Sequence, residues 1–529
     1  MNLLRNFATV GSFTMLSRVL GFIRDILIAA FLGTGIVADA FFVAFKLPNL
    51  FRRLFAEGAF NSAFVPLFAR SVEEGGATDA RRFAEEILSV LLVVLVATAV
   101  LAEIFTPVLV WIIAPGFAGE DADKFAITVA LTRICFPYLV AMSLVAFLSG
   151  ILNTFDRFAA AAFAPVLLNI VLITVLCGIG LSGLAQSPVA GWVLSWGVFA
   201  AGLVQAGMLF VAVRRYGFHF SLRRPRWTPR VKRLLHLGVP GVIAGGITQI
   251  NIMVGTIIAS FLPGAVSYLY YADRIYQLPL GVVGIAIGVA LLPDLSRRLR
   301  SGDGDGVHHT QNRALEFSLV LTLPAAVGLV LVPAEIISVL FQRGAFDAAD
   351  TLATSGALAA YGLGLPAFVL IKVLSPAFFA REDTATPMWF AGIAMAVNVV
   401  TALALFPILA HVGIALGTSL AGWVNVVLLW ATLARRGNYR PDALLRRRLP
   451  RMLASSVVMG GVVYGLAILL APAFGAPSLL VRAGGLVAMV GVGMTSFFVL
   501  CQLTGAIDLK RSLGQIAGRR APTPPAPPA

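Results

Sequence analysis

Several arginines of this chain lie inside long apolar stretches, where charged side chains are normally excluded. Arg18 and Arg24 fall within TMLSRVLGFIRDILIAAFLG, and Arg274 falls within YLYYADRIYQLP. An arginine at the centre of a bilayer costs about 2.5–3.5 kcal/mol even on the most lenient insertion scale. Such residues persist where they line a wet or partnered cavity. The pattern therefore indicates an anion-binding chamber within a membrane protein.

The charges within these stretches are mostly positive. Asp25 lies seven residues after Arg18, so the two share one helical face, with Arg24 on its flank. The next stretch adds Asp39, and Arg52 near its far end. The excess of cations over carboxylates favours an anionic ligand, and a phosphate or pyrophosphate matches the planar fork of arginine.

The composition is that of a membrane protein. Of the 529 residues, 59% are hydrophobic and only 12% are charged, whereas soluble domains carry about 25% charged residues. The net charge is +15, but the basic residues gather in the connections between apolar stretches. Membrane topology explains such basic loops better than nucleic-acid binding does.

Hydropathy predicts an all-α polytopic protein with about 14 transmembrane helices. The predicted spans lie near residues 8–32, 36–66, 85–113, 126–151, 158–180, 189–213, 236–262, 267–292, 314–333, 350–378, 386–408, 411–434, 452–472 and 479–504. Every second connection between the predicted spans is rich in arginine. The connections on the opposite side of the membrane hold only two basic residues, Lys124 and Arg343. The positive-inside rule then places both termini in the cytoplasm.

The chain also carries a faint internal repeat. FKLPNL at 45–50 is echoed by YQLPLG at 276–281, and Pro366 and Asn398 follow Pro137 and Asn169 at one common offset. Six spans followed by six in the same orientation form a parallel repeat, whose interface is where a transporter places its substrate. We therefore expect lobes at 1–230 and 231–449, two further helices within 450–508, and a basic, Pro-rich cytoplasmic tail at 509–529.

Signals for other chemistry are sparse. The sequence contains no Walker A loop, HExxH or GxSxG motif, so neither ATP hydrolysis nor these hydrolytic reactions are indicated. GDGDG at 302–306, with His308 and His309, lacks metal-ligand spacing and is predicted to be a solvated turn. We expect no metal and no cofactor. Cys135, Cys177 and Cys501 lie far apart in apolar runs and are predicted to be buried core residues.

Three long motifs resemble a known family. MNLLRNFATVGSFTMLSRVLGFIRDILIAAFLG, DAFFVAFKLPNLFRRLFAEGAFNSAFVPLF and YYADRIYQLPLGVVGIAIGVALLPDLS are similar to the MurJ/MviN lipid II flippases of the MOP exporter superfamily. The resemblance extends from residue 1 to about residue 505. It implies two pseudo-symmetric six-helix lobes around a central cationic cavity, plus two C-terminal helices that form a hydrophobic groove.

The resemblance also implies an activity and its partners. It implies flipping of lipid II, the undecaprenyl-pyrophosphate-linked peptidoglycan precursor, from the inner to the outer leaflet of the bacterial cytoplasmic membrane by alternating access. Membrane lipids surround such a protein, and cell-wall synthesis or division proteins are candidate partners. Nucleic acid is not among the expected partners.

The family's functional residues fall on matching positions of this chain. Arg18, Arg24, Arg52 and Arg274 are the implied cations of the substrate cavity. Asp25 is implied to orient Arg24, and a second set is implied to hold or gate the second helix: Asp39, Asn49 and Glu57. Where some relatives have sodium-binding carboxylates, this chain offers Asn251 and Asn398, which argues against sodium coupling.

Two alternatives remain open at this stage. A flippase or exporter of another polyprenyl-linked saccharide or amphiphile would share the fold and topology but have a different cavity. A membrane-embedded polyprenyl-phosphate transferase would need a base or an acidic metal-binding motif near its substrate, usually on a long loop. The outer connections are short and the basic loops carry no such cluster, so the transferase is the weaker alternative.

The predicted topology is tested with reporter fusions. Green fluorescent protein fused after residue 529 should fluoresce, and alkaline phosphatase fused there should stay inactive, because both termini are expected in the cytoplasm. Fusions made near Arg343, in a predicted outer connection, should behave in the opposite way. An active phosphatase at the C-terminus would overturn the predicted orientation.

Overall fold

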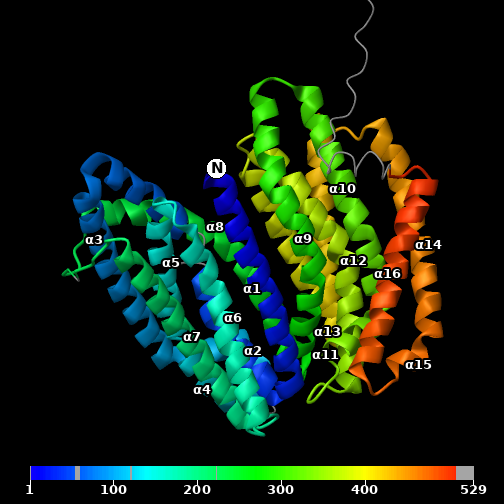
Figure 1. The fold of residues 1–529 in the computed structure, drawn as a ribbon, viewed down its shortest axis with the longest axis horizontal. Helices are drawn as coiled ribbons and strands as arrows, with labels where there is room; N and C mark the ends of the chain where they lie inside the picture. Colours follow the sequence, from blue (N-terminus) through cyan, green and yellow to red (C-terminus); the bar gives the residue numbers. More distant parts are fainter. Residues whose placement is uncertain (1, 54–59, 120–121, 222, 508–529) are drawn as a thin grey trace, which may run out of the picture. The chain divides into compact units, whose positions relative to one another are not determined.

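The computed structural model describes residues 2–53, 60–119, 122–221 and 223–507. Over these ranges the regular structure is helical, in 17 elements (Figure 1). The predicted site residue Glu57 and the tail at 509–529 lie outside the described residues. The prediction of an all-helical chain is therefore confirmed for the part that the structure describes.

The first elements are α1 (Asn2–Leu32), α2 (Ile36–Arg52), α3 (Phe60–Ile113), the 3₁₀ helix η2 (Pro115–Ala118), α4 (Ala122–Cys135), α5 (Tyr138–Thr154), α6 (Phe158–Leu181), α7 (Pro188–Arg215) and α8 (Pro229–Ala259). They are followed by α9 (Ala265–Arg300), α10 (Gly304–Leu331), α11 (Pro333–Phe341), α12 (Ala348–Phe379), α13 (Ala385–Arg435), α14 (Ala443–Leu469), α15 (Ala471–Phe474) and α16 (Leu479–Leu503).

Two of these elements each consist of two helices. Helix α3 has 54 residues and α13 has 51, whereas about 20 residues cross a bilayer. The chain leaves helical geometry at Gly76, where φ is +67°, and at Ala410, where φ is +49°. The break at Ala410 separates the predicted spans 386–408 and 411–434, so each half has the length of one crossing.

Among the described residues, nine helical segments are long and apolar enough to cross a membrane. Helix α1 is not one of them, because Arg18, Arg24 and Asp25 interrupt its apolar sequence. The protein is thus a polytopic membrane protein, and the charges within α1 lower the mean hydropathy of that helix.

The chain forms two compact units. The first comprises Met1–Tyr271, Leu340–Thr354 and Ala402–Ile414, and the second comprises Ala272–Val339, Ser355–Thr401 and the described residues from Ala415 onward. In the first unit α1 packs along α6, α6 packs on α7, and α5 packs on α7 and α3 (Figure 1). Gly202 of α7 lies so close to α5 that an added Cβ would stand 2.8 Å from the Tyr138 ring. Small residues allow such close packing of helices in membranes.

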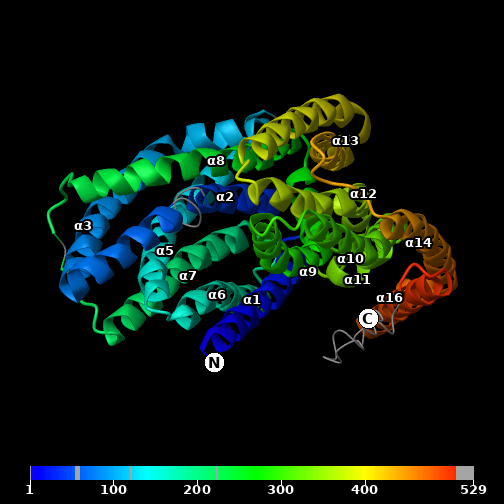
Figure 2. The ribbon, with the colours of Figure 1, turned by 90° about the horizontal axis from the view of Figure 1, so that it is seen from above.

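In the second unit, α14 packs between α10 and α16, and α14 and α16 lie side by side (Figure 2). Glu316 of α10 is buried, and its two carboxylate oxygens accept from Arg313 and from Arg448 of α14. Arg313 also donates to Asp442, whose carboxylate caps the first turn of α14 through Leu445 N at 2.7 Å. These ion pairs join α10 to α14 at one end.

A second ionic contact closes the turn between α12 and α13. Asp383 accepts from Thr386 N at 3.0 Å, Thr386 Oγ1 at 2.7 Å and Arg436 Nη1 at 2.6 Å. These donors lower the pKa of Asp383 to about 2. Because the folded-state pKa is depressed, this stabilisation is present above the ordinary pKa of the carboxyl and is lost as the pH falls toward 2.

Some details differ from the sequence predictions. Cys135 and Cys501 are buried as expected, but Cys177 of α6 is exposed, so its prediction as a core residue is wrong. Apolar periodicity cannot separate a lipid-facing position from a buried one, because both are apolar in a membrane protein. In the GDGDG segment, Asp303 accepts from Gly306 N at 2.8 Å and caps α10, so the helix begins within the predicted turn.

The buried ion pairs of Glu316 yield a stability prediction. Glu316→Gln should lower the free energy of unfolding by about 2 kcal/mol, because two partly buried arginines lose their shared carboxylate. The measurement is denaturant unfolding of the purified protein in detergent. The control is Glu74→Gln, because Glu74 and Arg70 form an exposed pair at 2.7 Å that should contribute under about 1 kcal/mol. Equal effects of the two substitutions would contradict the prediction.

Candidate functional site

The guanidinium of Arg24 lies at the centre of a buried polar network in the first unit. Arg24 is 8% exposed and Asp25 is 3% exposed. Arg24 Nε and Nη2 donate to Asp25 Oδ1 at 3.1 and 2.8 Å, and Nη1 donates to Asn169 Oδ1 at 3.0 Å. The Tyr270 hydroxyl of α9 also donates to Asp25 Oδ1, at 3.0 Å. Residues from α1, α6 and α9 therefore fix the plane of the guanidinium.

Asn169 connects this network to the backbone of α1. Its Nδ2 lies 2.9 Å from Ser17 O and 3.2 Å from Pro165 O, one turn earlier in α6. Gly21 faces the same amide, and a Cβ added there would lie 3.6 Å from it. Both polar atoms of the Asn169 side chain are thus hydrogen-bonded to α1, because Nδ2 donates to Ser17 O and Oδ1 accepts from Arg24.

Asp39 of α2 forms a second buried centre in the same unit. Its carboxylate is completely buried and accepts from Lys124 Nζ of α4 at 2.7 Å. It also accepts from Gly264 N at 3.0 Å, Ser267 N at 3.0 Å and Ser267 Oγ at 2.6 Å. Asp39 therefore holds α2, α4 and the first turn of α9 together.

Farther along α2 lie two more polar pairs. Lys46 donates to Thr256 of α8, and Arg52 Nε donates to Asn49 Oδ1 at 3.1 Å, one turn back in α2. Pro48 lies between these pairs and removes one backbone donor from the helix. Helix α2 thus carries Asp39, Lys46, Asn49 and Arg52 along its length, and each is engaged by another polar group.

The structure brings some of the predicted site residues together. Arg24 is in direct contact with Asp25, and Arg52 with Asn49. Arg18 is an exposed residue of α1, and Arg274 is a half-buried residue of α9 in the second unit. The roles of all eight predicted residues in transport stay predictions.

Several residues that sequence reasoning missed are part of these centres. Lys124 was expected in a connection, but it lies in α4, is 6% exposed and is ion-paired with Asp39. Tyr270 and Ser267 had no assigned role, and no spacing in the sequence relates them to residues of α1 and α2. Asn169 did carry a signal, since the internal repeat aligns it with Asn398, which accepts from Thr418 Oγ1 at 3.3 Å.

The side chains of these centres offer hydrogen-bond donors and charges that suit the binding of an anion. Within the described ranges no group of three or more His, Cys, Asp or Glu side chains could hold a metal ion. The Arg24 network offers a planar donor fork, which suits phosphate or carboxylate oxygens. Such a fork, fixed in place and enclosed by apolar helices, is suited to binding an anionic headgroup.

Sequence comparison identifies the family. The family profile described as lipid II flippase MurJ matches residues 28–484. A "Probable lipid II flippase MurJ" of Rhizobium tropici is 50% identical over 511 residues, which cover 96% of each chain. The chain belongs to the MurJ lipid II flippase family. A second relative with the same description, from Rhizobium meliloti (strain 1021), is 53% identical over 96% of this chain and 95% of its own length.

Solved structures agree with this family in fold. A structure described as "Lipid II flippase MurJ, inward closed conformation" matches with a TM-score of 0.78 at 24% identity, over 95% of this chain and 99% of the other. An inward-facing multidrug resistance MATE family transporter of the MOP superfamily matches with a TM-score of 0.66 at 15% identity, over 82% of this chain and 98% of the other. The chain thus has the MurJ fold, which is related to that of MATE transporters.

The ion pair between Asp39 and Lys124 yields a prediction about the energetic coupling of these two residues. Asp39→Asn should lower the free energy of unfolding by about 3 kcal/mol or more, because it leaves the Lys124 ammonium buried without a carboxylate. Lys124→Met should cost less, because Asp39 keeps three hydrogen-bond donors from α9 and the turn before it. The measurement is a double-mutant cycle by denaturant unfolding, with an expected coupling of about 2 kcal/mol. Additive effects of the two substitutions would show that the ion pair is energetically irrelevant.

Proposed function

We propose that this protein moves lipid II from the inner to the outer leaflet of the bacterial cytoplasmic membrane for peptidoglycan synthesis. The observation that carries the proposal is 50% identity to a relative described as a lipid II flippase, over 96% of both chains. The same family profile covers residues 28–484. The protein is accordingly a transporter and not an enzyme.

In the proposed mechanism, the arginines of the predicted cavity bind the pyrophosphate of lipid II. Arg24 supplies a fork that Asp25 and Asn169 hold in one plane, and Arg18, Arg52 and Arg274 add positive charge. A pyrophosphate competes with Asp25 for the N–H groups of Arg24, and the Tyr270 hydroxyl, 3.0 Å from Asp25 Oδ1, continues to solvate the carboxylate. This exchange of partners lets the site release its anion again.

The proposal also includes the number of membrane-crossing helices and their division into lobes. About 14 crossing helices form two six-helix lobes, 1–230 and 231–449, around the cationic cavity. The two C-terminal helices accompany the second lobe, and both termini lie in the cytoplasm. Rocking of one lobe against the other exposes the cavity to each side in turn, while the lipid chain of the substrate stays in the bilayer.

The membrane potential provides a driving force that needs no nucleotide. An inside-negative potential favours outward movement of an anion by about 2.3 kcal/mol per elementary charge per 100 mV. The same potential favours return of an empty, positively charged cavity to the inward-facing state. A cationic cavity thus couples both halves of the cycle to the potential.

The proposal is tested by the sidedness of lipid II in cells depleted of the protein. Depletion should leave lipid II on the inner leaflet, and expression of the wild type should restore it to the outer leaflet. Arg24→Ala should fail to restore it, because the guanidinium that binds the pyrophosphate is gone. Arg70→Ala, which removes an exposed arginine from its pair with Glu74, is the control and should behave as the wild type.

Two outcomes would contradict the proposal. Normal outer-leaflet lipid II during depletion, in cells without a second flippase, would indicate another polyprenyl-linked saccharide as the substrate. Full rescue by Arg24→Ala would be compatible with lipid II as the substrate but would show that transport does not require Arg24. Protein levels in the membrane, measured for each variant, distinguish lost transport from lost folding.

A further inference from the structure

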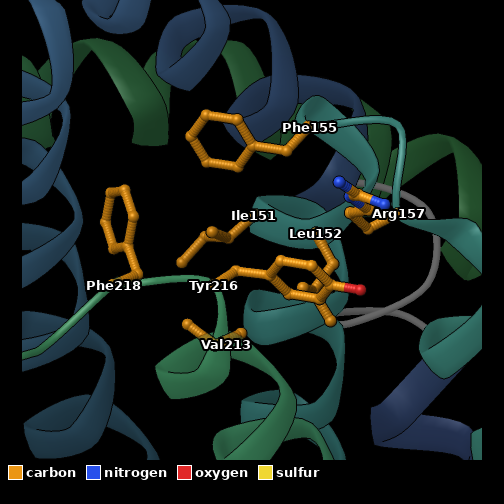
Figure 3. A pocket seen from close by; sticks show the side chains of 7 residues that line it. All are labelled: Ile151, Leu152, Phe155, Arg157, Val213, Tyr216 and Phe218. Atoms are coloured by element: carbon orange, nitrogen blue, oxygen red, sulfur yellow. The ribbon is translucent and has the colours of Figure 1, made fainter.

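A cavity of about 250 Å³ lies where the ends of α5 and α7 meet, within the first unit (Figure 3). The rings of Phe155, Tyr216 and Phe218 frame it, and Val213 of α7 closes one side. Arg157 is the one charged residue in its lining. Whole small-molecule sites usually measure about 300–1,000 Å³, so this cavity is sized for part of a larger molecule.

The guanidinium of Arg157 lies against one aromatic ring of the cavity. Its guanidinium carbon lies 4.8 Å from the centre of the Tyr216 ring, so the cation rests on the aromatic face. Among the described residues Arg157 forms no ion pair, although the exposed Asp156 is its neighbour in the chain. Stacking on a ring uses the face of a guanidinium and leaves the N–H groups at its edge able to bind an anion.

The walls of the cavity are fixed by the surrounding structure. Phe218 packs against Phe68 of α3 and against Phe155, and its ring centre lies 5.8 Å from each of theirs. The chain beyond it is bound to α3, because Glu85 accepts from Ser221 N at 2.9 Å and from Arg223 Nε at 2.6 Å. The Glu85 side chain is only 2% exposed. The Phe218 side of the cavity is therefore held in place by contacts with α3 and with Phe155.

The position of the cavity identifies the environment of its ligand. It lies at the ends of two apolar helices, α5 and α7. The ends of membrane-spanning helices generally meet the headgroup region of the bilayer. Arg214 and Arg215 form the last turn of α7 beside it, so the surrounding potential is positive. Clusters of basic residues directly outside a membrane span attract anionic lipids.

We propose that this cavity is a binding site for an anionic phospholipid of the surrounding membrane. Arg157 binds the lipid phosphate at the rim, and the start of an acyl chain enters the apolar cavity that the rings of Phe155, Tyr216 and Phe218 frame. The site is separate from the residues assigned to lipid II, and its occupant is a membrane lipid that stays in place during transport.

The test is lipid retention by the purified full-length protein. Binding of phosphatidylglycerol, measured by native mass spectrometry during titration in detergent, should be at least about tenfold weaker for Arg157→Ala, since a charge-assisted contact is lost. Arg435→Ala is the matched control, because it removes an exposed arginine from the last turn of a different helix, α13 of the second unit, and it should bind as the wild type. Arg157→Lys should give an intermediate affinity, because it keeps the charge but loses the planar fork.

Further arms of the experiment identify the chemical class of the ligand. Glycerol 3-phosphate should not displace the lipid, because it lacks the acyl chain; displacement would show a site for free phosphate and overturn the proposal. Phosphatidylcholine, whose choline cation neutralises its phosphate, should bind the wild type more weakly than phosphatidylglycerol does, and equal binding of the two lipids would overturn the proposal. Equal binding of phosphatidylglycerol by Arg157→Ala and wild type would also overturn it, leaving Arg157 and Tyr216 as an interfacial contact only. Thermal unfolding of each variant confirms that any loss is one of binding and not of folding.

Discussion

The burial of the Arg24 charge is the constraint on which the first unit depends. Removing a guanidinium from water costs several kcal/mol unless hydrogen bonds and an opposite charge replace its hydration. Asp25 supplies the charge, and Asn169 of α6 supplies a further acceptor. Because Asn169 also binds the Ser17 carbonyl, the packing of α1 on α6 is specified by polar contacts as well as by shape. In a bilayer such contacts give specificity that apolar side chains cannot, since lipid chains are equally apolar.

The first turns of α9 connect this centre to the second one. Tyr270 binds Asp25 of α1, and three residues earlier Ser267 binds Asp39 of α2, which in turn holds Lys124 of α4. A displacement of the start of α9 relative to α1 and α2 must break one of these contacts or carry all three helices along. This arrangement suits a transporter, because breaking and re-forming discrete polar contacts gives distinct conformational states. The proposed lipid site at Arg157 lies outside this network and would bind membrane lipid independently of it.

The sequence predicted much of the fold because hydropathy and charge act locally. The predicted spans are mostly helical over their described residues, and the break at Ala410 falls between two of them. The span predicted at 126–151 is an exception, because a turn at Phe136 and Pro137 divides it into α4 and α5. Arg24 was noticeable in the sequence because a charge within an apolar run is rare, and Asp25 is the next residue in the same run. The remaining partners were not predictable, because Asp39 contacts Gly264 and Ser267 more than 200 residues later and no local pattern encodes that distance. Lys124 was misplaced because a charge near a helix end is read as a loop residue unless its buried partner is known.

The most direct test of the central claim is lipid II transport by the purified protein in liposomes that contain no other protein. Fluorescent lipid II in the inner leaflet is protected from a membrane-impermeant quencher until it is flipped outward. If the Arg24 guanidinium binds the substrate, wild type and Arg70→Ala should expose the label at equal rates. Arg24→Ala, reconstituted in equal folded amount, should leave the label protected. Transport by Arg24→Ala at the wild-type rate would contradict the account, because the buried guanidinium would then serve the fold and not the substrate.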